Sequence, residues 1–205
     1  MQILAYKCLE SYDSETQKKL IEAFNDTAIK VCEGQQLDIE FESQNNLKFD
    51  DYIQMISYKT AVLLASSLKM GGIINNATET DLKSLYQIGL NMGTAFQIQD
   101  DYLDLFGDQN IIGKKIGGDI IKNKKTVMYH LYKENSSIED SNIQNDQKVS
   151  NIKKLFEENE IDLKTRELVK KYTSKTDEYI NALMIDTSKK KYLIDISNKL
   201  LSRDF

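Results

Sequence analysis

The sequence contains no proline and only 9 glycines among its 205 residues. Residues that interrupt helices are therefore scarce, and long helices are expected. No apolar run reaches the length of about 18 residues that a membrane span needs, and the N-terminus lacks a charged segment followed by an apolar one. The two cysteines, Cys8 and Cys32, do not have the spacing of a metal site. We therefore expect a cytoplasmic protein with reduced thiols and no membrane span.

The chain also lacks a basic surface signature. Its net charge is −5, and no basic patch with interleaved aromatic residues is present, which argues against binding to nucleic acid. Nothing around the single histidine, His130, suggests a proton relay, so we interpret it as a satisfied surface or core residue rather than a base. The hydrophobic fraction of 40% and charged fraction of 29% are typical of a globular protein with a sizeable core.

Apolar residues recur at spacings of three and four, and no useful stretch alternates with the period of a strand. The sequence therefore predicts a single all-α domain over residues 1–205, most simply an antiparallel helical bundle. The polar segment of about 133–151 is predicted to be a loop. The expected local features are a capping box at Ser14, a helix ending at Gly34, an acidic turn around Asp38 to Glu42, and helix starts at Asp50 and Thr80.

The most informative stretch runs from Gly93 to Lys125. Its centre, DDYLD, contributes Asp100, Asp101 and Asp104 to one stripe of a helix that begins near residue 82. Carboxylates four residues apart on a helix repel each other by a few tenths of a kcal/mol, roughly. A divalent cation reverses the sign of that cost, because Mg²⁺ prefers oxygen ligands.

Gly107 and Asp108 indicate the end of this helix, and a segment rich in glycine and lysine follows. Mg²⁺ is commonly shared between carboxylates and substrate phosphates, and lysine binds phosphate oxygens as a point charge. The combination suggests a metal-bridged diphosphate. The alternative is a solvated acidic helix end followed by a basic loop, and DDxxD alone does not decide between them.

The whole stretch carries a more specific signal. FQIQDDYLD, followed by GD, GK, GGD and NKKT, resembles the second aspartate-rich region of the trans-isoprenyl diphosphate synthases, or polyprenyl synthetases. That family includes the farnesyl and geranylgeranyl diphosphate synthases. Upstream, GQQLDIEFE and YIQMISYKTAVLL follow in the family's order. The resemblance covers most of residues 21–133 and implies an all-α bundle of the isoprenoid synthase type.

The resemblance also implies roles for individual residues. Asp100, Asp101 and Asp104 would bind Mg²⁺, and Asp100, Asp101, Lys59 and Lys114 would take part in catalysis. The implied substrate-binding residues are Lys59, Thr60, Gln97, Lys114, Lys124, Gln35 and Phe96. Two of these have simpler alternatives, since Lys59 could be a surface lysine beside a core threonine and Phe96 could belong to the core.

In the family, an allylic prenyl diphosphate ionises, isopentenyl diphosphate attacks the cation, and a proton is lost. The resemblance therefore implies a trans-prenyltransferase of isoprenoid biosynthesis that uses Mg²⁺ and forms a homodimer.

The sequence departs from the family in one respect. An earlier aspartate-rich motif followed by arginines precedes the matched region in relatives, and neither Asp50-Asp51 nor Asp38 with Glu42 replaces it. The arginines of this chain, Arg166 and Arg203, lie far downstream. We therefore expect an N-terminally truncated bundle, with helix 1–10 exposing Ile3, Leu4 and Leu9. Two hypotheses remain: a prenyltransferase, or a catalytically incomplete subunit or remnant that retains a Mg²⁺–diphosphate half-site.

Overall fold

The computed structural model describes residues 2–44, 46–108, 116–133 and 145–201. Within these ranges the chain forms helices and no strand, which confirms the predicted all-α class. The N-terminal half contains α1 (Gln2–Leu9), α2 (Ser14–Ser43), α3 (Phe49–Ile56), η1 (Ser57–Ala61), α4 (Val62–Ile74) and α5 (Glu79–Phe106). The C-terminal half contains α7 (Gly118–Ile121), α8 (Val127–Lys133), α9 (Asn145–Glu158), α10 (Ile161–Ala182) and α11 (Thr187–Leu201).

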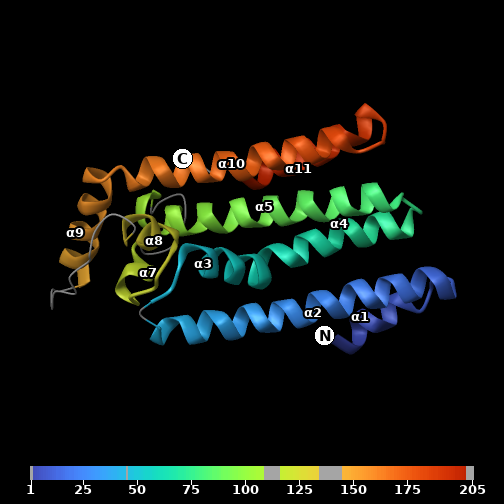
Figure 1. Ribbon diagram of the computed structural model, residues 1–205, viewed down its shortest axis with the longest axis horizontal. Coiled ribbons are helices and arrows are strands. Elements are labelled where there is room, and N and C mark those ends of the chain that lie inside the picture. The colour runs from blue at the N-terminus through green and yellow to red at the C-terminus, as the bar shows by residue number, and fades with distance from the viewer. Residues whose placement is uncertain (1, 45, 109–115, 134–144, 202–205) are drawn as a thin grey trace.

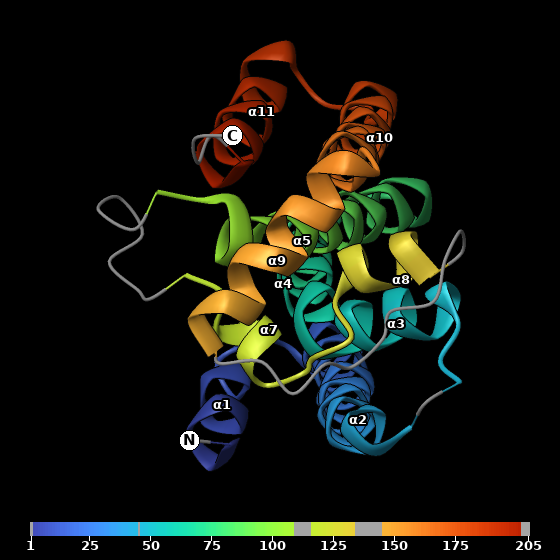
Figure 2. The same cartoon turned by 90° about the vertical axis from the view of Figure 1, so that its left-hand side faces the viewer.

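The long helices lie side by side along the longest axis of the molecule, and successive ones run in opposite directions (Figure 1). Helix α5 packs against α4 on one side and α10 on the other, and α2 packs against α4 and η1. Seen end-on, α7, α8 and α9 gather at one end of this antiparallel bundle (Figure 2). Side chains from α3, α5, α8, α9 and α10 form a core there, with Phe156 and Leu105 fully buried.

Two glycines of α5 allow η1 and the start of α4 to pack closely against it. A Cβ atom added at Gly93 would lie 2.6 Å from the Cα of Ala61, and one added at Gly89 would lie 2.5 Å from the backbone of Ala65. Because glycine has no Cβ, α5 lies closer to Ala61 and Ala65 than any larger residue at these two positions would allow. The same reasoning applies to Gly34 on α2, where an added Cβ would lie 2.3 Å from the backbone nitrogen of Lys59.

Several predicted helix limits are wrong. Helix α2 does not end at Gly34 but continues to Ser43, so the predicted acidic turn is its last part. Its N-cap is Asp13 rather than Ser14, because the Asp13 carboxylate accepts the amide hydrogens of Glu15 and Thr16.

The starts of α3 and α5 were also predicted at the wrong residues. Helix α3 starts at Phe49 after Lys48, and Asp51 accepts the Lys48 amide hydrogen. Helix α5 is capped by Thr78 instead of Thr80. Helix α9 begins at Asn145, within the segment predicted to be a loop, whereas residues 134–144 lie outside the described part of the chain.

The predicted exposure of α1 is confirmed for two of its three residues. Ile3 is 84% exposed and Leu4 is 60% exposed, whereas Leu9 is buried against Leu20 and its neighbours. Cys8 and Cys32 are free thiols on the surface. In the ranges that the structure describes, none of the helices is long and apolar enough to cross a membrane.

Candidate functional site

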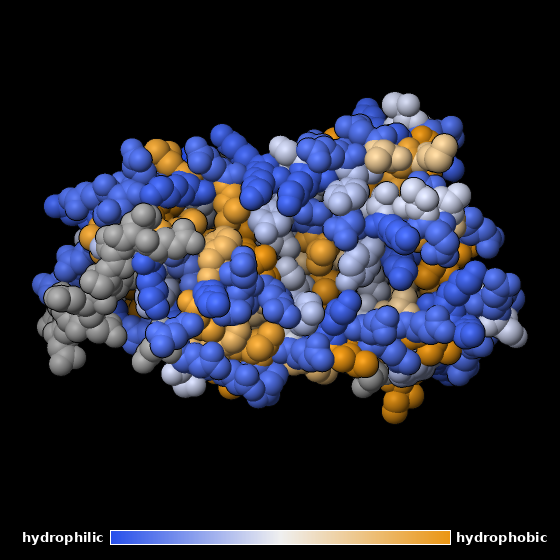
Figure 3. All heavy atoms as spheres, viewed as in Figure 1, coloured by the Kyte–Doolittle hydropathy of each residue, from blue (hydrophilic) through white to orange (hydrophobic). Residues whose placement is uncertain are grey.

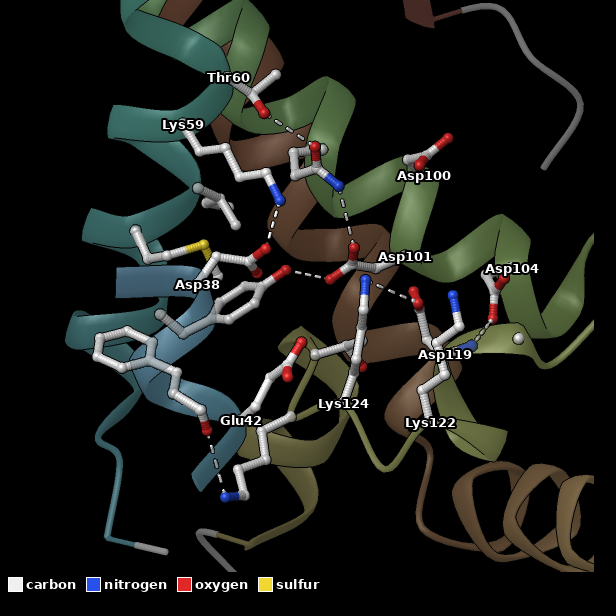
Figure 4. Close-up of a pocket in the computed structure, with 18 residues that line it drawn as sticks. Asp38, Glu42, Lys59, Thr60, Asp100, Asp101, Asp104, Asp119, Lys122 and Lys124 are labelled. Carbon is white, nitrogen blue, oxygen red and sulfur yellow. Dashed lines mark hydrogen bonds and ion pairs between the residues drawn. The ribbon is translucent and has the colours of Figure 1, made fainter. Parts of the chain in front are cut away.

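A cavity of about 420 Å³ opens at the end of the bundle where α2, α3, α5 and α7 meet (Figure 4). Its lining includes three apolar side chains, Phe41, Met55 and Ile56, but most of its side chains are polar or charged. Carboxylates come from α2, α5 and α7, and lysines come from η1 and the segment after α7. The cavity thus combines both signs of charge beside a short apolar wall.

One wall of the cavity is an ion pair between α2 and η1. The Lys59 Nζ lies 2.5 Å from the Asp38 carboxylate, and both side chains are partly buried. Because Gly34 lies one turn before Asp38 and contacts the Lys59 backbone, the close packing of α2 on η1 positions this pair. Helix α2 must continue past Gly34 for Asp38 to face Lys59, which is what the structure shows.

The opposite wall is centred on Asp101, which is buried. Its carboxylate accepts hydrogen bonds from the Tyr52 hydroxyl, from Gln97 Nε2 at 3.2 Å, and from the Val127 amide at 3.3 Å. Burial raises the pKa of Asp101 to about 7, although these three hydrogen bonds favour the charged form. Gln97 is oriented in turn by Thr60, whose hydroxyl donates to Gln97 Oε1 at 3.1 Å.

The third part of the site joins α5 to α7. Asp104 Oδ2 accepts the backbone amide hydrogen of Asp119 at 3.0 Å, and the Gly117 amide donates to the Asp104 carbonyl. Burial raises the pKa of Asp104, and the nearby charge of Asp119 acts in the same direction. Asp119 also pairs with Lys124 at 3.2 Å. Burial lowers the pKa of Lys124, but attraction by Asp119 outweighs this and leaves the pKa raised.

The three aspartates of DDYLD are thus in different environments. Asp101 is buried, Asp104 is half-buried, and Asp100 is exposed and projects from α5 away from the group around Asp101 (Figure 4). Over the described ranges, three acidic, histidine or cysteine side chains nowhere gather closely enough to hold a metal ion by themselves.

The structure brings most of the predicted site residues together. The following seven line the cavity: Lys59, Thr60, Gln97, Asp100, Asp101, Asp104 and Lys124. Gln35 and Phe96 are not among the lining residues, so their assignments stay predictions. Lys114 lies outside the described residues.

Sequence reasoning missed Tyr52, Asp119 and Thr126 as parts of the site. Asp119 lies in the GGD sequence that was noticed as part of the stretch, so its acidic character was a usable signal. Nothing in the sequence around Tyr52 indicates that its hydroxyl reaches Asp101, 49 residues later.

His130 lies behind the site rather than in it. It is buried on α8, with its ring 5.4 Å from that of Tyr52. Burial lowers its pKa to about 4, so the neutral imidazole is favoured in the folded chain. It does not line the cavity and is a core residue, but its buried Nε2 has no hydrogen-bond partner within the described ranges, so the prediction of a satisfied histidine is wrong for that atom.

Comparison with known proteins gives a consistent family assignment. The sequence profile of the family described as polyprenyl synthetase matches residues 1–159. Among curated proteins, the chain is 40% identical over 116 residues to a short chain isoprenyl diphosphate synthase of Methanothermobacter thermautotrophicus, which covers 57% of this chain and 36% of that protein. It is also 40% identical over 122 residues to a geranylgeranyl diphosphate synthase of Saccharolobus solfataricus, covering 60% and 37% of the two chains.

A solved geranylgeranyl pyrophosphate synthase superposes on 99% of this chain with a TM-score of 0.89 and 37% identity. The superposition covers 66% of the solved chain. The chain therefore spans 36% and 37% of the two curated relatives by sequence, and 66% of the solved relative by structure.

Proposed function

Because this chain belongs to the polyprenyl synthetase family, we propose that it serves prenyl transfer, the condensation of an allylic prenyl diphosphate with isopentenyl diphosphate. The observation that carries the proposal is the cavity in which Lys59 and Lys124 lie across from the carboxylates of α5. In a cavity lined by both kinds of side chain, the lysines can bind the oxygens of a diphosphate and the carboxylates can bind its counter-cation.

The lysines and the carboxylates of the cavity have different roles in binding a leaving diphosphate. Lys59 and Lys124 supply positive charge to its oxygens, and each is already held in place by a carboxylate, Asp38 or Asp119. Stabilising charge on a leaving group in a preorganised site is a major source of catalysis. Asp100 would help to hold a Mg²⁺ ion, which when bound would supply further neutralisation of the leaving group.

Asp101 and Asp104 take a different part in this proposal. Their oxygens already accept hydrogen bonds from Tyr52, Gln97, and the Val127 and Asp119 amides. They therefore tie α5 to α3, α7 and α8. Asp100 lines the cavity and is the most exposed of the three carboxylates, so we assign the contact with a metal ion to it.

The apolar side of the cavity suits the other end of the substrate. Phe41, Met55 and Ile56 line it on the side of α2 and α3. An allylic cation must be kept from water, and apolar side chains beside the diphosphate site exclude water from that region. We propose that the first carbons of the prenyl chain lie against these three residues.

The second candidate function is a half-site that binds the metal–diphosphate without turning it over. One observation favours it: apart from the lysines, the cavity is lined by no other cationic side chain of the described residues. Arg166 donates hydrogen bonds to the Tyr102 hydroxyl instead, at 2.6 and 2.9 Å.

We also propose the family's homodimer and a cytoplasmic location for this protein. Ile3 and Leu4 on α1 and Ile29 on α2 are exposed apolar side chains of the kind that a second copy would cover. Light scattering coupled to gel filtration measures the mass directly, and a monomer at high protein concentration would argue against the dimer.

The test of the proposed function is a prenyl-transfer assay with the two diphosphates and Mg²⁺, followed by identification of the product. Asp100→Asn removes one charge at the cavity, and Asp50→Asn removes one from the exposed first turn of α3 as a matched control. We expect product with the unchanged chain and with Asp50→Asn, and a loss on the order of a hundredfold or more with Asp100→Asn.

The outcomes separate the two candidate functions. Product formation supports the transferase. Metal-dependent binding of the allylic diphosphate without product supports the half-site. An equal effect of the two aspartate substitutions would contradict both candidate functions, because Asp100 would then matter no more than an exposed aspartate outside the cavity.

A further inference from the structure

The turn between α10 and α11 lies at the end of the bundle away from α7 and α9 (Figure 1), and it carries exposed apolar side chains. The Met184 side chain is 82% exposed, Tyr192 is 71% exposed, and Ile185 is also on the surface. Apolar surface is visible at this end of the molecule in Figure 3. Helix α4 ends at the same end of the bundle with another exposed apolar residue, Ile74.

The backbone of this turn is anchored. The Met184 amide donates to Asp81 Oδ1 at 3.0 Å, and Asp81 is itself buried at the start of α5. The Thr78 hydroxyl donates to the other oxygen of Asp81 at 2.9 Å. On the far side of the turn, Lys190 Nζ donates to the Asn181 carbonyl at 2.6 Å. Met184 is therefore held outward by a fixed backbone, where nothing in the described chain covers it.

The same turn is locally basic in an acidic protein. Lys189, Lys190 and Lys191 form the first part of α11, and Asp186 is the sole acidic residue between positions 184 and 192. The whole chain carries a net charge of −5. Neither Lys189 nor Lys191 takes part in an ion pair within the described ranges, and both are exposed.

We propose that the α10–α11 tip, defined as Met184, Ile185, Lys189 to Lys191 and Tyr192, docks on an anionic lipid surface. Lysines close to anionic head groups contribute attraction, tyrosine is favoured at the boundary between water and lipid, and small apolar side chains insert shallowly. The tip supplies all three kinds of side chain within nine residues.

Charge and chemistry favour this occupant over two others. In a symmetric contact with a second copy, the same patch meets itself, so three lysines would face three lysines. A nucleic acid would attract the lysines, but it offers no apolar environment for Met184 and Ile185. A lipid surface satisfies both features of the tip at once.

The test is sedimentation of the full chain with vesicles of phosphatidylcholine alone and of phosphatidylcholine mixed with phosphatidylglycerol. We expect binding to the anionic vesicles only, weakening as salt is added. Removing two exposed charges, Lys189→Gln with Lys191→Gln, lowers partitioning on the order of tenfold. Met184→Gln keeps the length of the side chain and lowers partitioning roughly severalfold, because it removes an apolar group that inserts.

The matched control is Lys170→Gln with Lys171→Gln, two exposed lysines in the middle of α10, and this variant should bind as the unchanged chain does. An equal loss of vesicle binding in the control pair would show that binding depends on overall charge rather than on the tip, and it would overturn the proposal. A loss with the tip lysines but none with Met184→Gln would assign the tip to a polyanion and also overturn it. Absence of binding to anionic vesicles, or a self-association that Met184→Gln disrupts, would have the same consequence.

Discussion

Replacing Tyr52 by phenylalanine should change the ionisation of Asp101 more than it changes packing. The substitution deletes one hydroxyl from a buried ring and leaves its volume nearly unchanged. That hydroxyl donates to the Asp101 carboxylate, whose pKa is about 7 because burial outweighs its hydrogen bonds. A hydrogen bond to a charged group contributes about 1.5–3 kcal/mol net, so losing it should raise the pKa of Asp101 further, by about one to two pH units.

The sign of the stability change follows from this pKa. In the folded chain the pKa of Asp101 lies above its ordinary value of 3.8, so the folded state holds a proton that the unfolded state has released. The contribution of Asp101 to the free energy of unfolding therefore falls as pH rises from about 4 through about 7. In Tyr52→Phe this fall continues to higher pH, so the deficit relative to the unchanged chain grows by about 1.5–3 kcal/mol between acidic and alkaline conditions.

Urea unfolding of both proteins over this pH range measures the deficit, and carbonyl NMR of the aspartates reads the pKa directly. Tyr132→Phe is the matched control, because Tyr132 is also a buried tyrosine but packs against Phe156. A deficit that does not depend on pH, or the same pH dependence in the control, would refute the reasoning.

Three further predictions concern binding and packing. Lys59→Gln should weaken binding of a diphosphate by about 10- to 100-fold, since it removes a charge-assisted contact, and it should leave the circular dichroism spectrum nearly unchanged. Calorimetry measures the affinity, and an unchanged affinity would contradict the prediction. Gly93→Ala should destabilise the fold by about 2 kcal/mol or more, because the added Cβ would meet Ala61. Gly71→Ala is the control: an added Cβ there has nothing within 4 Å, so it should be neutral or stabilise the fold by up to about 1 kcal/mol. Equal shifts of the two denaturant midpoints would contradict this account of the packing. For His130, whose pKa is lowered to about 4, stability should fall as pH drops from about 6.5 to about 4, and a His130→Gln variant should lose that part of the pH dependence.

The fold could be predicted from the sequence because its signals are local. Spacing by threes and fours and the absence of proline favour long helices, and α5 follows the predicted stripe from near residue 82 to Gly107. Gly34 shows the limit of that reasoning. A glycine after an apolar stripe is typical of a helix end, but here it lies inside α2 because another backbone approaches it. Sequence alone does not separate these two uses of glycine.

The site was predicted as a set of residues but not as a geometry. The residues of DDYLD, together with Lys59 and Lys124, carry a motif, so they were recognised without knowledge of the packing. Their unequal roles depend on neighbours from other helices. Asp101 is buried because α3 and α8 cover it, and its partners Tyr52 and Val127 are distant in sequence. Only the packed bundle distinguishes buried Asp101 from exposed Asp100.

The most direct test of the central claim is a calorimetric titration of the full chain with an allylic thiodiphosphate, which ionises too slowly to react, with and without Mg²⁺. The account predicts one site per chain, binding that depends on Mg²⁺, and loss of that dependence in Asp100→Asn but not in Asp50→Asn. Binding that is indifferent to Mg²⁺ and to Asp100, or no binding at all, would contradict the assignment of this cavity to a metal-bound diphosphate.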